Sequence, residues 1–523
     1  MLRRRLLYEY GAYFRGRVPL AFSAVSLCVR GSTESRERGT LGCVTRITDG
    51  EAWRSLSIRS EECAAQLKTV EAWLTRPPTL PLKVSVTLKN DKASVDTVAL
   101  LEEFSVRLER CGVHVVFFVK LNEISTLEPF AALLSRAEEV TLNRCRTLTS
   151  LDGLDGRRCL KRVNCNDCDM TDFSAIRTCA LLEAATFSSC PGLTSLDALR
   201  GLQSLAIVEV IDCPVIRLDA VRACPSLESV SFSACRSLTS IDELQGLKQL
   251  KSVFLWGCCV TSLDALRTCP TLESVSLASC HDMTSLDALQ GLQQLKSVTV
   301  IDCPITGLGA LRTCPSLERV VCRPPHTVSL QPLEGLKCLK EVGFSAGNVG
   351  DIHALHTCTA LEVVDISGGV DLSSLERVLP RLRKLMIESC GVTNLDALHT
   401  CEALEELRVH SCSSLTSVEH FKAPPSLKYI TISDCPITSI RSLNTCVSLR
   451  SVDVSSCPLL CSLDGLGDLT NLEEVRADRS GITDVAAIAQ CPSLRYVDVR
   501  DCPQLQSVDV LLKRGDVKVD YNL

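Results

Sequence analysis

The sequence predicts an α/β solenoid, a curved horseshoe with a parallel β-sheet on its concave face and short helices or turns on its convex face. A unit of 21 to 23 residues recurs seventeen times, from the copy that starts at Ala137 to the copy that starts at Leu494. Each copy repeats one short apolar pattern, and cysteines recur at fixed places within it. A fixed period of this length is typical of stacked units that contact only their neighbours. We therefore expect one long array in place of several globular domains.

Segments that do not match the repeat flank this array. We divide the chain into an extension over 1–41, an α/β cap or degenerate repeats over 42–136, the seventeen repeats over 137–516 and a cap strand over 517–523. In the N-terminal flank the apolar spacing predicts a strand at Leu82–Leu88, a helix at Ser94–Arg110 and a buried strand at Val113–Val119. Caps are expected because an open end would expose apolar side chains and unpaired backbone groups.

The first 41 residues leave three interpretations open. Met1–Arg17 is basic, and Val18–Val29 is a mostly apolar run of 12 residues. That run is too short to cross a membrane, and no longer apolar run follows, so we expect no transmembrane segment. The segment is a disordered or loosely packed extension, a secretory signal or an organellar presequence.

Within a unit, the pattern predicts one short strand and one short outer turn. In Leu227–Cys235 the spacing points Leu227, Val230, Phe232 and Cys235 inward, with a strand around Val230–Phe232. A segment of the type L-T-S-L-D-A-L follows, and its aspartate is a suitable N-cap for one helical turn. The aspartates expected to act in this way are Asp152, Asp197, Asp242, Asp264, Asp287, Asp396 and Asp464.

The 31 cysteines follow the repeat. Thirteen stand just after the strand, as Cys258 and Cys280 do, and eight more occur in alternate units, as Cys269 does, which indicates a duplicated module of two repeats. Side chains at equal positions on adjacent strands point the same way about 4.8 Å apart, which does not suit a disulfide. We interpret the cysteines as buried free thiols that can bond turn carbonyls, with bridging or metal binding as the alternative. Reduced thiols favour a cytoplasmic protein. We also expect Cys280→Ser to destabilise more than Cys280→Ala, because serine would add a stronger polar group to a dry interior.

Catalytic and cofactor motifs are missing from the sequence. Nucleotide-binding glycine loops, metalloprotease motifs and serine-hydrolase elbows do not occur. Cys165 and Cys168 match C-x-x-C without a second pair at zinc spacing, and His353 and His356 fall in a short outer segment. The net charge of −6 and pI near 5.9 give no nucleic-acid footprint. We expect no enzyme activity, cofactor, metal, nucleic acid or small-molecule substrate.

Side chains that project from the concave strands are the candidate partner-binding residues. Near the middle of the array they are apolar, namely Ile207, Ile211, Phe254, Trp256 and Ile301. Large aromatics among small residues are typical of an interface hot spot, although Trp256 could instead lie flat and cover the sheet.

Toward the C-terminus the same face becomes charged. Its candidate residues are Arg408, His410, Tyr429, Asp453, Arg476, Asp478, Tyr496, Asp498 and Arg500, with Lys384 and Glu388 beside them. Mixed charge with tyrosine suits a selective protein interface, and an ordinary solvated face is the alternative. Between the two patches, Cys322–His326 (CRPPH) replaces the usual turn, which indicates a local change of curvature.

The segment LTSLDAL at Leu193–Leu199 resembles the short, 22-residue subclass of leucine-rich-repeat proteins, which includes the regulatory subunit of protein phosphatase 1 and the bacterial internalins. Cysteine in place of the usual asparagine, and the alternating RTCPSLE at Arg312–Glu318, are more specifically similar to kinetoplastid leucine-rich-repeat proteins, some of them named adenylate cyclase regulatory proteins. The resemblance covers Ala137 to about Arg514 and implies a solenoid that binds macromolecules.

These observations favour a non-catalytic scaffold that binds protein partners along its concave sheet. The alternatives are a regulatory subunit of an enzyme, such as an adenylate cyclase, a phosphatase or a ubiquitin ligase, and a secreted or surface adhesion protein. The identity of the partner is not encoded in any motif of the chain.

Overall fold

The structure is a computed structural model that describes residues 55–59, 82–89, 92–110, 115–326, 328–345, 352–368 and 381–522. These residues all belong to one compact unit, Arg54–Leu523. The interpretations of residues 1–41 lie outside the described residues, as do the glycines at 347 and 369 that replace the repeated cysteine.

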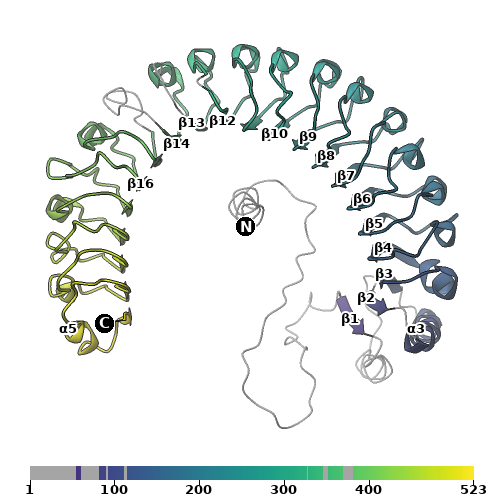
Figure 1. Ribbon diagram of the computed structural model, residues 1–523, viewed down its shortest axis with the longest axis horizontal. Helices are drawn as coiled ribbons and strands as arrows, with labels where there is room; N and C mark the ends of the chain where they lie inside the picture. The colour runs from purple at the N-terminus through teal and green to yellow at the C-terminus, as the bar shows by residue number, and fades with distance from the viewer. Residues whose placement is uncertain are drawn as a thin grey trace, which may run out of the picture. The chain divides into compact units, whose positions relative to one another are not determined.

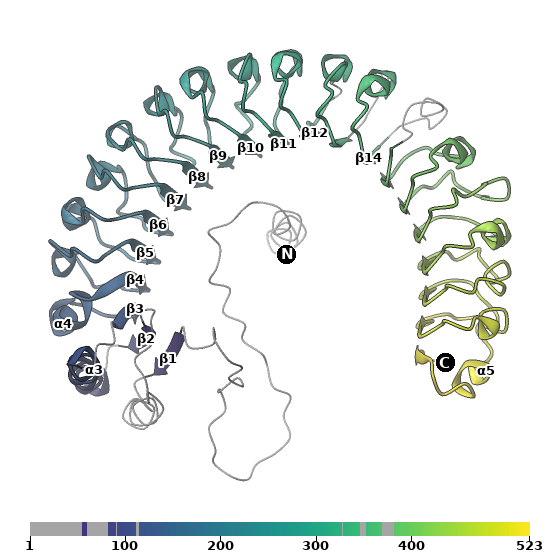
Figure 2. The ribbon, with the colours of Figure 1, turned by 180° about the vertical axis from the view of Figure 1, so that it is seen from behind.

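In the described residues, 21 strands form a single sheet, and each strand pairs in parallel with the next strand along the chain. The strands line the inner side of the curved repeat array, and the outer side carries short turns (Figures 1 and 2). Their bounds are β1 Ser55–Arg59, β2 Leu82–Lys89, β3 Val115–Asn122, β4 Ala137–Asn143, β5 Arg162–Asn166, β6 Ala184–Ser188, β7 Ile207–Ile211, β8 Ser229–Ser233, β9 Ser252–Trp256, β10 Ser274–Ala278, β11 Ser297–Ile301, β12 Arg319–Arg323, β13 Glu341–Ser345, β14 Val363–Ser367, β15 Lys384–Glu388, β16 Glu406–His410, β17 Tyr429–Ser433, β18 Ser451–Asp453, β19 Glu474–Arg476, β20 Tyr496–Asp498 and β21 Lys518–Asp520.

Helical structure is short except near the N-terminus. The α-helices are α3 Lys92–Arg110, α4 Ala131–Leu134 and α5 Asp509–Leu512. The outer 3₁₀ turns are η2 Glu128–Phe130, η3 Asp152–Leu154, η4 Ser174–Thr178, η5 Asp197–Leu199, η6 Val221–Ala223, η7 Asp242–Leu244, η8 Asp264–Thr268, η9 Asp287–Leu289, η10 Gly309–Thr313, η11 Gln331–Leu333, η12 Ile352–Thr357, η14 Asp396–Thr400, η15 Arg441–Thr445 and η16 Ile488–Gln490. A 22-residue unit has no room for a longer helix on its outer side. The recurring strands and short outer turns confirm the predicted solenoid.

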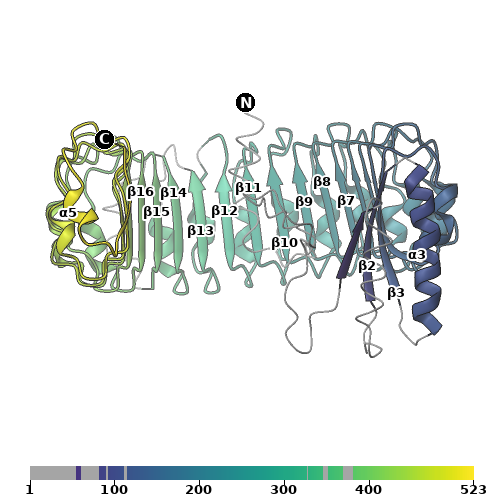
Figure 3. The ribbon, with the colours of Figure 1, turned by 90° about the horizontal axis from the view of Figure 1, so that it is seen from below.

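The N-terminal flank contains the three elements expected from its spacing. Strand β2, helix α3 and strand β3 follow in that order, and Val98, Leu101 and Phe104 of α3 are buried. Strand β3 pairs with both β2 and β4, so the flank extends the sheet of the repeats directly. Figure 3 shows α3 beside this end of the sheet.

Each of the seventeen predicted units contributes one strand, from β4 to β20. In the unit of β8, Leu227, Val230, Phe232 and Cys235 are fully buried, as the pattern predicts. The strand is followed by Ala234 in the left-handed region, with φ of 55°, and its N–H donates to the carbonyl of Trp256 at 2.6 Å. Most units place one such residue before the cysteine. This turn directs the cysteine into the core.

The aspartates of the outer segment are not N-caps, so that prediction is wrong. Asp264 is the first residue of η8, and the cap position is Leu263, which makes no side-chain cap. The capping acceptor is the hydroxyl of Ser262, which receives the N–H of Asp264 at 3.0 Å. The same contact recurs at Ser240, Ser285 and Ser462. A serine hydroxyl can accept the backbone N–H of the residue two positions later. The serine therefore makes the bond that was expected of the aspartate.

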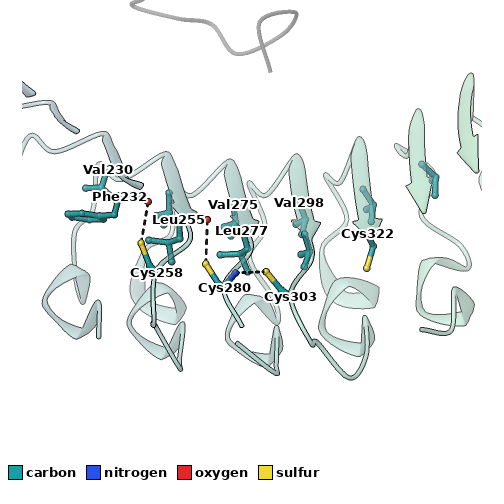
Figure 4. Close-up of a cluster of buried hydrophobic side chains, with 14 of the residues drawn as sticks. Val230, Phe232, Leu255, Cys258, Val275, Leu277, Cys280, Val298, Cys303 and Cys322 are labelled. Atoms are coloured by element: carbon teal, nitrogen blue, oxygen red, sulfur yellow. Dashed lines mark hydrogen bonds between the residues drawn. The ribbon is translucent and has the colours of Figure 1, made fainter. Parts of the chain in front are cut away.

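The cysteines after the strands are buried free thiols that bond backbone carbonyls, which confirms their interpretation. The thiol of Cys258 donates to the carbonyl of Phe232 at 3.4 Å, and that of Cys280 donates to Leu255 at 3.6 Å. The N–H of Cys280 in turn donates to the sulfur of Cys303 at 3.4 Å (Figure 4). The row therefore links neighbouring repeats through sulfur wherever the cysteine is present.

A second row of thiols joins repeats in pairs on the outer side. The hydroxyl of Thr268 accepts the N–H of Gly246 at 2.8 Å, and the thiol of Cys269 donates to the carbonyl of Leu244 at 3.4 Å. Gly246 has φ of 81°, a conformation that favours glycine. These contacts recur at Thr178–Cys179, Thr313–Cys314 and Thr357–Cys358. The predicted two-repeat module is therefore visible in the hydrogen bonds.

A row of ion pairs, which the sequence analysis missed, follows the same two-repeat period. It uses the second residue of the unit, where acidic and basic residues alternate without a break from Glu228 to Lys428. The pairs include Glu138–Lys161, Glu228–Lys251, Glu273–Lys296, Glu318–Lys340 and Glu405–Lys428, with N–O distances of 2.8 to 3.0 Å. This alternation favours stacking of the repeats in their native order. If one repeat were skipped, residues of like charge would face each other.

Candidate functional site: the concave face of the sheet

Apolar side chains in the middle of the concave face stand on β7 and β9. Ile207, Ile211, Phe254 and Trp256 are half-buried, as expected for residues that project from the sheet. Trp256 is in register with Ser233 on one side and Ala278 on the other, and both of these small residues are buried. Their burial beside a large indole supports the alternative in which Trp256 lies against the sheet while it keeps part of its surface in solvent.

The expected exposure of Ile301 is wrong. This side chain stands on the same row as Ala278 and Arg323 but is only 8% exposed. Side chains in one row of adjacent parallel strands stand about 4.8 Å apart, so the long neighbouring Arg323 can shield it. Ile301 therefore extends the core, and the apolar patch is confined to β7 and β9.

An ion pair crosses the concave face at the unusual unit of β12. The guanidinium of Arg323 reaches across β13 to the carboxylate of Asp365 at 2.6 Å. Gly343 stands between them on β13, where an added Cβ would come within 3.3 Å of Val321 and 3.7 Å of Asp365. Burial raises the pKa of Asp365, and the nearby Arg323 opposes that shift. A side chain at position 343 would therefore crowd Val321 and lie against Asp365.

Glu209 is the half-buried acid of the apolar patch. It lies on β7 between Ile207 and Ile211, in register with Thr186 and Ser231. Burial raises the pKa of this carboxyl, because a charged group loses hydration among apolar neighbours. The sequence analysis passed over Glu209, although an acid in the run IVEVI was visible.

The charged end of the concave face forms a hollow of about 380 Å³, called here the C-terminal hollow. Its lining residues lie at or just after the ends of β17 to β20 and are Ser433, Asp434, Asp453, Ser455, Ser456, Arg476, Asp478, Arg479, Asp498 and Arg500. Five of these were predicted from the strand pattern, namely Asp453, Arg476, Asp478, Asp498 and Arg500. The structure brings these five together.

The hollow residues that sequence reasoning missed follow the strands. Asp434, Ser456 and Arg479 are left-handed turn residues, with φ of 54°, 56° and 57°. Alternation along a strand says nothing about such positions, so the pattern did not reveal them. Their fixed place in the unit could have revealed them. Asp434 and Ser456 stand directly before a buried cysteine, and Arg479 stands directly before Ser480, which replaces that cysteine.

Each arginine of the hollow pairs with a nearby carboxylate. Arg500 donates two hydrogen bonds to Asp498, from Nε at 2.8 Å and from Nη2 at 2.6 Å. Arg500 lowers the pKa of Asp498 through these bonds. The expected exposure of Asp498 is wrong, because the arginine above it leaves it buried. The hollow can therefore offer charged groups to a ligand, chiefly from its arginines.

Tyr496 is held beside the hollow by its neighbours. Its hydroxyl donates to Asp520 at 2.8 Å, which raises the pKa of the phenol to about 12. Arg476 lies 5.8 Å and Lys518 lies 5.1 Å from the centre of its ring. These contacts fix the ring between two cations. Tyr496 therefore packs beside Arg476, which lines the hollow, and is not itself one of the lining residues.

Three predicted residues lie beside the hollow, on β16 and β17. Tyr429 is exposed, Arg408 pairs with Glu406, and the Nδ1 of His410 bonds the hydroxyl of Ser433, which does line the hollow. They make the surface next to the hollow polar. Their role in binding stays a prediction.

Groups of three or more histidine, cysteine, aspartate or glutamate side chains that could hold a metal ion do not occur in the described part of the chain. Cys165 and Cys168 are both buried, and the thiol of Cys168 donates to the carbonyl of Asn166 at 3.3 Å. Of the helices that the structure describes, none has the length and apolar character needed to cross a membrane.

A family model for repeats agrees with the repeat geometry. The family model for the BspA type leucine rich repeat region matches residues 158–284 and 211–319. A search of curated proteins returns no significant match. An internalin from Listeria monocytogenes is similar at 16% identity, over 70% of this chain and 88% of that chain, with a TM-score of 0.38.

Two further solved structures are similar at low identity. A leucine-rich-repeat protein of Leptospira interrogans shares 15% identity over 76% of this chain and 93% of that chain, with a TM-score of 0.48. The functional domain of InlJ from Listeria monocytogenes, which includes a cysteine ladder, shares 17% identity over 70% of this chain and 74% of its own, with a TM-score of 0.43. The repeated strand, left-handed turn and 3₁₀ turn show that the fold is a leucine-rich-repeat solenoid, and the family model matches its middle part.

Proposed function

We propose that the chain is a non-catalytic scaffold that binds protein partners on the concave face of its repeat array. One observation carries this proposal. The inward residues of the strands are nearly the same in every unit, whereas the solvent-facing residues differ. Strand β8 presents Ser229 and Ser231, β9 presents Phe254 and Trp256, and β16 presents Arg408 and His410. A uniform core beneath a varied face suits a rigid support for recognition.

The cysteines support a reducing location for this scaffold. All 27 cysteines among the described residues are unbridged, and 23 of them are buried. Burial raises the pKa of the thiol of Cys322 to about 12, which keeps it neutral. We propose a cytoplasmic protein on this basis, and a regulatory subunit of an enzyme would use the same face. A secreted adhesion protein has less support, because unbridged thiols are uncommon in oxidising compartments.

Site-specific photo-crosslinking in the native cell tests the proposal. A benzophenone amino acid replaces Ser231 or Thr431 on the concave strands, and Arg441, an exposed residue on an outer turn, provides the matched control. We expect protein adducts from at least one concave position and none of the same mass from Arg441. Absence of adducts from both concave positions, or the same adducts from the outer one, would overturn the proposal.

A further inference from the structure

We infer that the C-terminal hollow binds an acidic segment of a protein partner through Arg476, Arg479 and Arg500. This inference rests on the proposed scaffold function and specifies the chemistry of one partner. It starts from a difference between the two signs of charge in the hollow. Both occur among the lining residues in similar number, but they are not equally accessible.

The arginines are more exposed to solvent than the carboxylates that hold them. The side chains of Arg476, Arg479 and Arg500 are 51%, 64% and 55% exposed. Their partners Glu474, Asp478 and Asp498 are 31%, 17% and 5% exposed. A ligand in the hollow therefore meets guanidinium groups first. The buried carboxylates orient those groups and reduce the entropy lost when a ligand binds.

Each guanidinium can bind a second carboxylate in its present orientation. Arg500 contacts Asp498 through Nε and Nη2, and Arg479 contacts Asp478 at 2.9 Å through the same two atoms. A guanidinium carries five N–H donors in a planar fork, so these contacts leave Nη1 and a second N–H of Nη2. That remaining edge matches the two oxygens of a carboxylate.

Two aspartates determine how an acidic segment would lie. Asp453 accepts the N–H and the hydroxyl of Ser455 at 3.0 and 2.6 Å and is half-buried. Asp434 accepts the hydroxyl of Ser411 at 2.9 Å and is exposed. Because Asp434 follows β17, a carboxylate of the segment is favoured over β19 and β20 and is repelled near β17. A neutral or basic residue suits that end.

Discrete carboxylates fit this surface better than a nucleic-acid backbone. A continuous polyanion needs a basic tract, whereas Asp434 and Asp453 interrupt the arginines and the chain carries a net charge of −6. Single-stranded nucleic acids also use aromatic rings as stacking platforms. The ring of Tyr496 already lies near the cations of Arg476 and Lys518. The observations therefore favour a protein segment.

Fluorescence anisotropy with the full chain tests this inference. The probe is a fluorescein-labelled peptide of alternating glutamate and serine, and the comparison peptide has glutamine in place of glutamate. We expect the acidic peptide to bind at least about tenfold more tightly, since a hydrogen bond between two charged groups is stronger than one to a neutral amide. Its affinity should fall as salt is added, because these charges are solvent-exposed.

Variants place the binding in the hollow. Arg479→Gln should weaken binding of the acidic peptide about tenfold, and Arg500→Lys should weaken it too, because lysine keeps the charge without the planar fork. Arg441→Gln is the matched control, since Arg441 is 76% exposed on an outer turn, and it should leave the affinity unchanged. Circular dichroism verifies that each variant is folded. Arg479→Gln tests the inference even if Arg500→Lys does not fold. Asp478, which loses its partner in Arg479→Gln, is 17% exposed and so stays partly hydrated.

Four results would overturn the inference. They are no binding of the acidic peptide, equal binding of the glutamine peptide, unchanged affinity of folded Arg479→Gln, and tighter binding of single-stranded RNA than of the acidic peptide. The proposed scaffold function fails separately. Protein adducts at Ser231 or Thr431 without binding of acidic peptide would retain the scaffold and reject only the acidic segment.

Discussion

The hydroxyl of Ser480 donates to the carbonyl oxygen of Val454 at 2.7 Å, in the place where most repeats have a cysteine. It also accepts the N–H of Cys457 at 3.2 Å, and Ser480 is 1% exposed. The corresponding thiol of Cys280 lies 3.6 Å from the carbonyl of Leu255. The serine oxygen therefore makes the same contact between repeats as the cysteine sulfur, over a shorter distance. A serine hydroxyl at this position has hydrogen-bond partners inside the core.

This contact reverses the expectation for Cys280. We predict that Cys280→Ser is at least as stable as Cys280→Ala, because the hydroxyl can keep the donor that alanine removes from the carbonyls of Leu255 and Ala278. The loss on substitution by alanine should be about 1 kcal/mol. Denaturation midpoints of the two variants, with Cys461→Ser as an exposed control, provide the measurement. A lower midpoint for serine than for alanine would restore the sequence-based expectation.

The alternating ion pairs predict a charge-specific effect at Lys296. Its amine lies 2.9 Å from Glu273, and Glu318 occupies the equivalent position one repeat further on. Lys296→Glu should therefore destabilise by about 0.5–1 kcal/mol more than Lys296→Gln, because like charges then face each other at a partly exposed site.

Salt distinguishes this effect from a loss of packing. The stability difference between Lys296→Glu and Lys296→Gln should shrink in about 1 M salt, where charges are screened beyond roughly 3 Å. Guanidinium chloride would itself screen the charges, so urea is the suitable denaturant. A difference that persists at high salt would show that the row contributes through packing and not through charge.

Periodic features of the molecule were predictable from the sequence, whereas contacts between side chains were not. The burial of Phe232 and Cys235 follows from spacing alone, because every unit faces the same core. The role of Asp264 did not follow, since a serine two residues earlier can bond the same backbone N–H. The burial of Asp498 depends on Arg500 folding over it, and the place of Arg479 depends on a turn after the strand. These contacts depend on how the side chains and turns are oriented, and the residue types alone do not determine that orientation.

The apolar patch predicts a loss of partner binding when its aromatics are removed. Phe254→Ala combined with Trp256→Ala should weaken binding of a partner found by crosslinking at Ser231 by about 2 kcal/mol or more, as is common for aromatic hot spots. Isothermal titration with the purified partner provides the measurement. The array should remain folded, because both side chains are only half-buried on the concave face.

Tyr429→Ala is the matched control for this double variant. Tyr429 is 47% exposed on β17, away from the patch on β7 and β9, so its removal should not change binding at Ser231. Unchanged affinity of the double variant would mean that Trp256 only covers Ser233 and Ala278, and the patch would be rejected as a binding site.

Glu209 predicts a pH-dependent stability. Burial raises the pKa of this carboxyl above its value in the unfolded chain, so the folded state binds the proton more tightly. Glu209 therefore costs no stability below the ordinary glutamate pKa of about 4.3, and its cost grows as the pH rises through the folded pKa. We predict that Glu209→Gln stabilises the protein at neutral pH and that the gain vanishes in acid. Urea denaturation across this range, with Glu402→Gln as an exposed control, measures the effect. A gain of equal size in acid would show that glutamine acts through packing, because the charge of Glu209 is already neutralised there.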